Sequence, residues 1–175
     1  MKKRKISMKV IGVVVVAFAV LLGAAAYLNS QRAAEQMAGS GQLTITRDGA
    51  AVAVYSIDDL KKMKAVDAEV HLDSASSSDD DGLFTGVPLS VLLNDTDPAL
   101  LKECTRFTMT AGDGFSSALS REDLEEDEEI LVVYAQDGTA LKHFDDGGSG
   151  PLRLIAGNDI YGNRSTKYLV SIDCK

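Results

Sequence analysis

The segment Gly86-Val87-Pro88-Leu89-Ser90-Val91-Leu92-Leu93, near the middle of the sequence, combines loop residues with an apolar run. Its Gly and Pro are typical of loops, whereas Leu89 to Leu93 is almost entirely apolar and favours a short apolar helix. Asp97-Pro98 then supplies a cap and a first helical position for another turn. The segment therefore predicts a loop, from Leu83 onward, that leads into two short helical stretches.

A β-hairpin is predicted before this segment. Residues Gln42 to Arg47 alternate in polarity, and Ala50 to Tyr55 resumes as a second strand. The two runs are separated by Asp48-Gly49, which is one of the strongest two-residue hairpin turns. We therefore expect these runs to pair as antiparallel strands.

A capped helix and a further strand are predicted after the hairpin. Ser56 and Asp59 have the spacing of a capping box, which indicates the start of a short helix. Val66 to Leu72 can then return as a strand. The run Asp73 to Gly82 is rich in Ser and Asp and cannot bury a core, so we expect an exposed loop. A weak calcium site at Asp79-Asp80-Asp81 is the alternative interpretation of that loop.

The second half of the chain alternates between strand and turn patterns. Asp113-Gly114 and Asp137-Gly138 have turn composition, and Ser120 with Asp123 forms a second capping-box candidate. Ile130 to Tyr134 is continuous and apolar, as a strand buried on both faces would be. The other strands are predicted at Thr105 to Ala111, Phe115 to Leu119, Pro151 to Ala156 and Thr166 to Ile172. The sequence therefore predicts an α+β fold, with a mixed, mostly antiparallel sheet and short helices.

The N-terminus has the composition of a membrane anchor. Val10 to Leu28 is an uncharged, almost wholly apolar run of 19 residues, which is long enough as a helix to cross a bilayer. A cationic flank precedes it, and the positive-inside rule keeps such a flank in the cytoplasm. The flank contains Lys2, Lys3, Arg4, Lys5 and Lys9. The alternative is a cleaved secretory signal, with the small residues Ala24 to Ala26 before Tyr27. Both interpretations place the rest of the chain outside the cytoplasm.

The chain is therefore divided into four parts. Residues 1–9 are a cytoplasmic basic flank, 10–28 the transmembrane anchor or signal peptide, 29–41 a juxtamembrane linker and 42–175 one extracytoplasmic domain. The expected location is the cell membrane, with a single pass and the N-terminus in the cytoplasm; cleavage would make the domain a secreted protein. The formal net charge is -8, and no basic stripe follows the flank, so we expect no nucleic-acid partner.

Export changes the interpretation of the two cysteines, Cys104 and Cys174. An even pair in an oxidising compartment favours a disulfide bond, which would close a loop of about 70 residues. Two unpaired thiols, one of them buried, are the alternative. Neither cysteine has a neighbour that would suggest a CxxC redox pair or a zinc site.

Five phrases of the sequence occur in the order found in the molybdopterin-binding domain of the sulfite oxidase family. They are Gly86 to Leu93, Thr110 to Ser116, Ile130 to Gly138, Gly150 to Leu154 and Tyr161-Gly162 to Lys167-Tyr168. The chain resembles that family over roughly Leu43 to Ile172. The resemblance implies a sulfite-oxidase-like α+β fold that carries a pterin-bound molybdenum held by one cysteine thiolate.

The resemblance also implies which residues would hold the cofactor. Arg153 and Lys167 fall at the positions of the family's Pro-Leu-Arg strand and later Lys, and Gly150 and Tyr161 lie in the adjoining phrases. Cationic side chains from neighbouring strands suit this task, because they can pair with a pyrophosphate-like anion. The alternative is that both cations are surface charges paired with local carboxylates.

The sequence departs from the family where the metal would be ligated. The family's cysteine corresponds to the stretch near Leu72 to Ser78, which contains no cysteine. Ser74 and Asp73 are not equivalent ligands, since a soft thiolate holds and tunes the metal. The family's His-Gly is replaced by Asp145 to Gly150, with His143 slightly upstream. A fold does not carry its chemistry with it, so the scaffold can persist without the metal.

Other catalytic motifs are absent from the sequence. It has no Gly-x-Ser-x-Gly elbow, P-loop or His-Glu-x-x-His motif, and its two histidines cannot build a histidine-rich metal site. Two hypotheses remain. The first is an exported, membrane-anchored module that binds a small anion or a protein partner on this scaffold without molybdenum chemistry. The second is a molybdopterin-dependent oxidoreductase with an atypical metal site.

Overall fold

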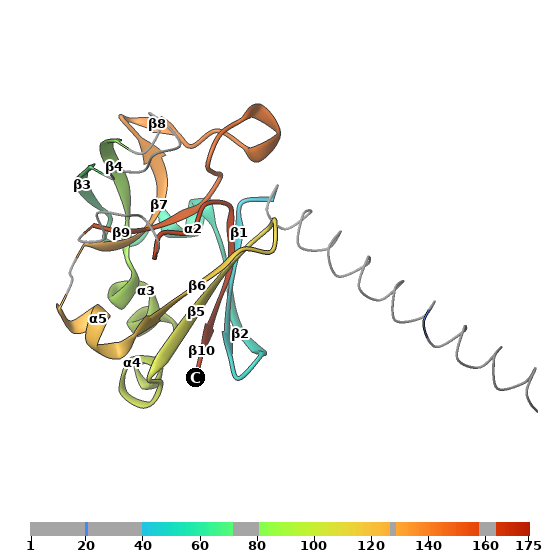
Figure 1. Ribbon diagram of the computed structural model, residues 1–175. Helices are drawn as coiled ribbons and strands as arrows, with labels where there is room; N and C mark the ends of the chain where they lie inside the picture. Colours follow the sequence, from blue (N-terminus) through green and yellow to red (C-terminus); the bar gives the residue numbers. More distant parts are fainter. Residues whose placement is uncertain (1–19, 21–39, 72–80, 127–128, 158–163) are drawn as a thin grey trace, which may run out of the picture. The chain divides into compact units, whose positions relative to one another are not determined.

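Two β-sheets carry the folded part of the chain in a computed structural model, which describes residues 20, 40–71, 81–126, 129–157 and 164–175 (Figure 1). In these ranges the first sheet has the order β2-β1-β10-β5-β6. Its strands are β1 (Gln42–Arg47), β2 (Ala50–Ser56), β5 (Arg106–Ala111), β6 (Ser116–Ser120) and β10 (Leu169–Cys174). Strands β1 and β10 pair in parallel, whereas the other neighbours in this sheet are antiparallel.

The second sheet has the order β3-β4-β7-β8, and β9 also pairs with β7. Its strands are β3 (Val66–His71), β4 (Asp81–Pro88), β7 (Ile130–Gln136), β8 (Thr139–Ala140) and β9 (Arg153–Ala156). The helical elements among the described residues are α2 (Ile57–Leu60), α3 (Leu89–Thr96), α4 (Pro98–Glu103), α5 (Arg121–Glu126) and the 3₁₀ turn η2 (Phe144–Asp146). The α+β prediction is confirmed, with its strands divided between two sheets rather than joined in one.

Apolar residues of both sheets meet in one main core. Leu43 and Ile45 of β1, Phe107 of β5 and Ile172 of β10 belong to the same buried cluster as Val132 of β7. Helices α3 and α4 contribute fully buried apolar side chains to this cluster. These are Leu89, Leu92, Leu93 and Leu100. The short apolar helices predicted from the sequence are therefore core elements.

Strand β7 is buried on both faces, as its sequence predicts. Ile130, Val132 and Tyr134 contribute to the main core, whereas Leu131 and Val133 belong to a second, smaller cluster. Side chains alternate between the faces of a strand, so the second cluster lies on the opposite face of the second sheet. It also contains Ala68, Val70, Phe84, Leu141 and Ile155.

The expectation of a loop from Leu83 to the apolar helix is wrong, because these residues form strand β4. The strand pairs with β3 on one side and with β7 on the other, and the register with β7 shifts between Thr85 and Gly86. At Gly86 a Cβ atom would lie 2.4 Å from the carbonyl oxygen of Val132 and 2.7 Å from the Cα of Val133. The glycine thus permits a close approach of two backbones and does not mark a loop.

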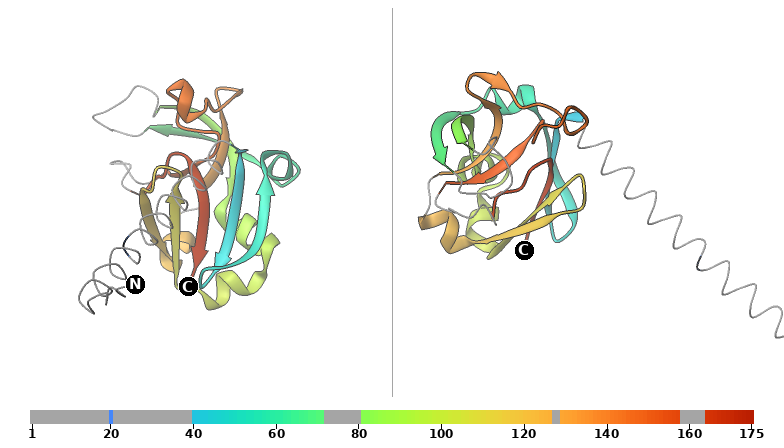
Figure 2. Two further views of the ribbon diagram at one scale, coloured as in Figure 1. Left: turned by 90° about the vertical axis from the view of Figure 1, so that its right-hand side faces the viewer. Right: turned by 45° about the horizontal axis from the view of Figure 1, so that its top comes forward.

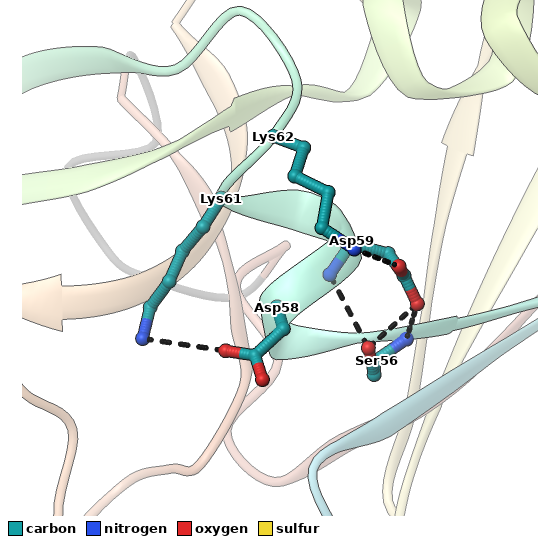
Figure 3. A network of polar contacts seen from close by, with 5 residues as sticks. All are labelled: Ser56, Asp58, Asp59, Lys61 and Lys62. Carbon is teal, nitrogen blue, oxygen red and sulfur yellow. Dashed lines mark hydrogen bonds and ion pairs between the residues drawn. The ribbon is translucent and has the colours of Figure 1, made fainter.

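The local turn and capping predictions are confirmed. Asp48 and Gly49 have φ angles of 51° and 79°, as a two-residue hairpin turn requires. At α2 the Ser56 hydroxyl accepts the Asp59 N–H, and the Asp59 carboxylate accepts the Ser56 N–H (Figure 3). Lys62 also pairs with Asp59 at 2.9 Å. The Ser56 hydroxyl, which donates to Asp59, is the main reason that the pKa of this carboxyl falls to about 2. The predicted helix through Met63 ends earlier, at Leu60.

Several sequence predictions lie outside the described residues. They are the apolar run 10–28 apart from Val20, the calcium alternative at Asp79 and Asp80, and Tyr161. Within the part of the chain that the structure describes, no helix combines the length and hydropathy needed to span a bilayer.

Candidate functional site

Arg153 is a cation buried inside the protein. Strand β9 pairs with β7 so that Arg153 lies opposite Val133, a member of the second apolar cluster. The Arg153 side chain is 1% exposed, and its guanidinium carbon lies 5.7 Å from the centroid of the Phe84 ring. This geometry is a cation–π contact, which stabilises a cation more strongly when water is excluded. Arg153 is therefore not one of the surface charges that the sequence left as an alternative.

Lys167 lies opposite Arg153 across an antiparallel bridge. The Leu154 N–H donates to the carbonyl of Thr166 (2.8 Å), and the Thr166 N–H donates to that of Leu154 (2.9 Å). In an antiparallel pair this register places the residue before Leu154 opposite the residue after Thr166. The structure thus brings together the two cations that the resemblance singled out. We refer to Arg153 and Lys167 as the cation pair.

Tyr168 connects the cation pair to the loops around it. Its φ of 55° is in the left-handed region, so the chain turns sharply between Lys167 and β10. The Tyr168 N–H donates to the carbonyl of Ser149 (3.0 Å), and its own carbonyl accepts the N–H of Gly112 (2.9 Å). Its ring makes an edge-on contact with Phe144, with 4.8 Å between the centroids. Burial, with a smaller contribution from Asp113, raises the pKa of Tyr168, whereas the positive charge of Arg153 opposes that shift.

The loop from Leu141 to Gly150 is packed tightly on itself. Its backbone N–H groups at Gly148 and Gly150 donate to the carbonyls of His143 and Lys142, each at 2.9 Å. A Cβ atom at Gly150 would lie 2.4 Å from the Cβ of Leu141, and one at Gly148 would lie 2.2 Å from the Lys142 carbonyl oxygen. Gly150 was predicted as a cofactor-binding residue. The structure gives it a packing role beside the cation pair, while His143 is exposed.

A polar network holds the segment before β10 that contains Lys167. The Ser117 hydroxyl lies 2.7 Å from the Thr166 hydroxyl and donates to the carbonyl of Arg164 (3.0 Å). Arg164 in turn pairs with Asp123 at 2.7 Å. The backbone N–H of Ser120 is the largest influence that lowers the pKa of Asp123, and Arg164 adds to this effect. Sequence reasoning found the Ser120 and Asp123 capping box but missed its connection to Arg164.

The two cysteines lie at the other end of β10 from the cation pair. Cys174 ends the strand that begins at Leu169, and the rise of a β-strand separates those residues by about 16 Å. Cys104 is the C-terminal cap of α4. Burial is the main cause of the raised pKa of Cys174, and the Cys104 side chain also contributes to it. Both thiols are free in the structure, so the predicted disulfide bond is not formed in it.

The donor atoms near the cation pair do not fit a molybdenum ion held by a thiolate. The chain has two cysteines in all, and each is buried at the far end of β10. Among the residues described, no group of three or more His, Cys, Asp or Glu side chains could hold a metal ion. The cation pair carries positive charge, which is the kind of charge that attracts an anionic group.

Comparison with known proteins shows the family of the chain. The model of the oxidoreductase molybdopterin binding domain matches residues 34–175, which is most of the chain. The chain belongs to this family. The cation pair therefore lies in a domain of the oxidoreductase molybdopterin-binding family. No curated protein matches the sequence.

A solved structure shows the same fold at low sequence identity. The sulfane dehydrogenase SoxCD from Paracoccus pantotrophus matches with a TM-score of 0.57 and 16% identity. The match covers 76% of this chain and 37% of that chain. The molybdopterin-binding domain described here thus spans little more than a third of the SoxCD chain that it matches.

Proposed function

We propose that this protein is a membrane-anchored, extracytoplasmic binding module that uses the molybdopterin-binding scaffold without molybdenum redox chemistry. The proposed ligand is a small anion that carries phosphate-like charge. The position of the cysteines is the observation that carries the proposal. Both thiols lie at the far end of β10 and are buried, so neither can reach a metal beside the cation pair. A molybdenum centre of this family needs that soft ligand.

The cation pair supports the anion-binding part of the proposal. Lys167 is partly exposed and opposite Arg153, so a ligand that arrives from solvent meets Lys167 first. Arg153 is buried beside Phe84, where its charge is screened less than in water. A charge-assisted hydrogen bond is among the stronger polar contacts that a protein can offer an anion. The two cations together therefore favour an anion with more than one negative charge.

Molybdenum content tests the loss of redox chemistry. We expect the full-length protein, purified from a host that makes the cofactor, to contain far less than one molybdenum atom per chain by elemental analysis. A family enzyme that retains the ligating cysteine, produced in the same host, is the positive control. Cys104→Ser/Cys174→Ser should leave the low metal content unchanged. Stoichiometric molybdenum in the unmodified protein would contradict the proposal and support an oxidoreductase with an atypical site.

Membrane anchoring rests on the N-terminal sequence. The cationic flank followed by residues 10–28 should orient the chain with its domain outside the cytoplasm. We expect a phosphatase reporter, which is active only outside the cytoplasm, to be active when fused after Lys175. The matched control replaces Lys2, Lys3, Arg4 and Lys5 with neutral residues, which should weaken this orientation. Activity of a cytoplasm-specific reporter at the same fusion point would contradict the export of the domain.

A further inference from the structure

The two cysteines are held together by the backbone on both sides of them. Cys174 pairs with Phe107 of β5 and with Arg47 of β1, so its position in the middle of the first sheet is fixed. Beyond it, the carbonyl of Lys175 accepts the N–H groups of Thr105 (2.6 Å) and Arg106 (3.0 Å). These bonds anchor the segment that follows Cys104 directly against the end of β10. The thiols meet because two segments separated by about 70 residues are tied at this point.

The surroundings of the thiols exclude solvent. Cys104 is 2% exposed and Cys174 is fully buried, and both belong to the main apolar core. The guanidinium of Arg121 donates two hydrogen bonds to the Cys104 carbonyl, at 2.9 and 2.7 Å, and an Arg47–Glu103 ion pair flanks the same end of the sheet. Burial raises the pKa of Cys104, and it raises that of Cys174 to about 12. The thiolate is the nucleophile, so these protonated, buried thiols react slowly with oxidants in the native protein.

From this arrangement we infer that Cys104 and Cys174 form a structural disulfide bond. The bond forms while the chain folds and is then buried in the native core, out of reach of redox reagents. Two S–H bonds are lost and one S–S bond forms. The two electrons and two protons pass to a protein disulfide of the thiol-disulfide oxidoreductase class, which is reduced to a dithiol. This disulfide bond is independent of anion binding. It rests on the proposed export of the domain, because an exported domain meets an oxidant of this class.

Refolding in a defined redox buffer tests the inference without relying on export or on molybdenum. The full-length chain, in detergent, is reduced and unfolded, and then refolded with either oxidised and reduced glutathione or a reductant alone. Free thiols are alkylated in denaturant and counted by mass spectrometry. We expect the glutathione-refolded chain to have no free thiol and to be lighter by two hydrogen atoms. Two titratable thiols in that folded chain would overturn the inference.

The inaccessibility of the buried cysteines to redox reagents is tested on protein that is already folded. The chain refolded with reductant, then transferred to oxidised glutathione in native buffer, should lose its thiols at least 100-fold more slowly than the unfolded chain. The oxidised native chain should likewise resist a dithiol concentration that reduces it in denaturant. Rapid oxidation or reduction of the native chain would show an accessible, switchable pair and overturn the buried structural bond.

The expected effect of the bond on stability is a melting temperature roughly 10 °C higher for the oxidised chain than for the reduced one, since the bond closes a long loop. Cys104→Ser/Cys174→Ser is the matched control, because its melting temperature should not respond to reductant. If this variant does not fold, the comparison of oxidised and reduced wild-type protein still decides the outcome. Equal melting temperatures for those two forms would contradict a stabilising bond.

Discussion

Gly86→Ala is expected to lower the free energy of unfolding by about 3 kcal/mol or more, as strong overpacking of a core does. The added methyl group would lie 2.4 Å from the Val132 carbonyl oxygen and within 2.8 Å of its carbonyl carbon. Both atoms belong to the backbone of β7, which is paired with β4 and β9 and cannot move away alone. The substitution should therefore separate β4 from β7 at the centre of the second sheet.

Thermal unfolding of the purified protein measures this effect, and we expect the melting temperature to fall by roughly 10 °C. Gly49→Ala is the matched control. It adds the same methyl group in a hairpin turn where no heavy atom lies within 4 Å. The φ of 79° at Gly49 still makes alanine unfavourable there, by roughly 1–2 kcal/mol. Equal losses at the two positions would show that the close approach at Gly86 is not the cause.

Arg153→Ala is expected to reduce both stability and anion binding, whereas Lys167→Ala should reduce binding alone. Removing the largest fully buried side chain leaves a cavity and ends the contact with Phe84, at a cost of about 3 kcal/mol of unfolding free energy. Lys167 is partly exposed, so truncating it should change stability by less than about 1 kcal/mol. Inorganic pyrophosphate is the probe, and isothermal titration calorimetry measures its affinity.

For Lys167→Ala we expect the pyrophosphate affinity to fall about tenfold, as the loss of one charge-assisted hydrogen bond implies. The matched control is Lys102→Ala, which removes the same charge from the exposed surface of α4. That variant should bind pyrophosphate like the unmodified protein. A similar loss in both lysine variants would show that pyrophosphate responds to overall charge and not to the cation pair. Unchanged binding in Lys167→Ala would remove that residue from the site.

The sequence predicted the features that depend on neighbouring residues. The hairpin turn at Asp48-Gly49 and the capping box at Ser56 and Asp59 need only two to four consecutive residues, and both are present. Strand β4 was mistaken for a loop because Gly and Pro are rare in strands. Glycine is needed at position 86 of the strand because the backbone of β7 lies so close to it. Strand β7 begins more than 40 positions later in the chain, so this contact is not visible in the local sequence.

The site was predictable only in part for a similar reason. Resemblance to a family pointed to Arg153 and Lys167, and the bridge between Leu154 and Thr166 places them opposite each other. The network that holds the segment before β10 joins Ser117, Arg164 and Asp123, which come from separate parts of the chain and have no shared motif. The burial of Arg153 could likewise not be predicted from the sequence, since it results from the packing of β9 beside β7 and Phe84.

The place of β10 between β1 and β5 has a consequence for biosynthesis (Figure 2). Strand β1 is synthesised early, but its parallel partner β10 is the last strand in the described part of the chain. Thr44 of β1 can therefore pair with Ser171 only after β10 has been made. A ribosome adds about 5–20 residues per second, so the β1–β2 hairpin spends several seconds with an open edge. During this interval the exposed edge of β1 is a template for pairing with another nascent chain. A chaperone that masks this edge during synthesis would therefore protect the protein when it is most prone to aggregate.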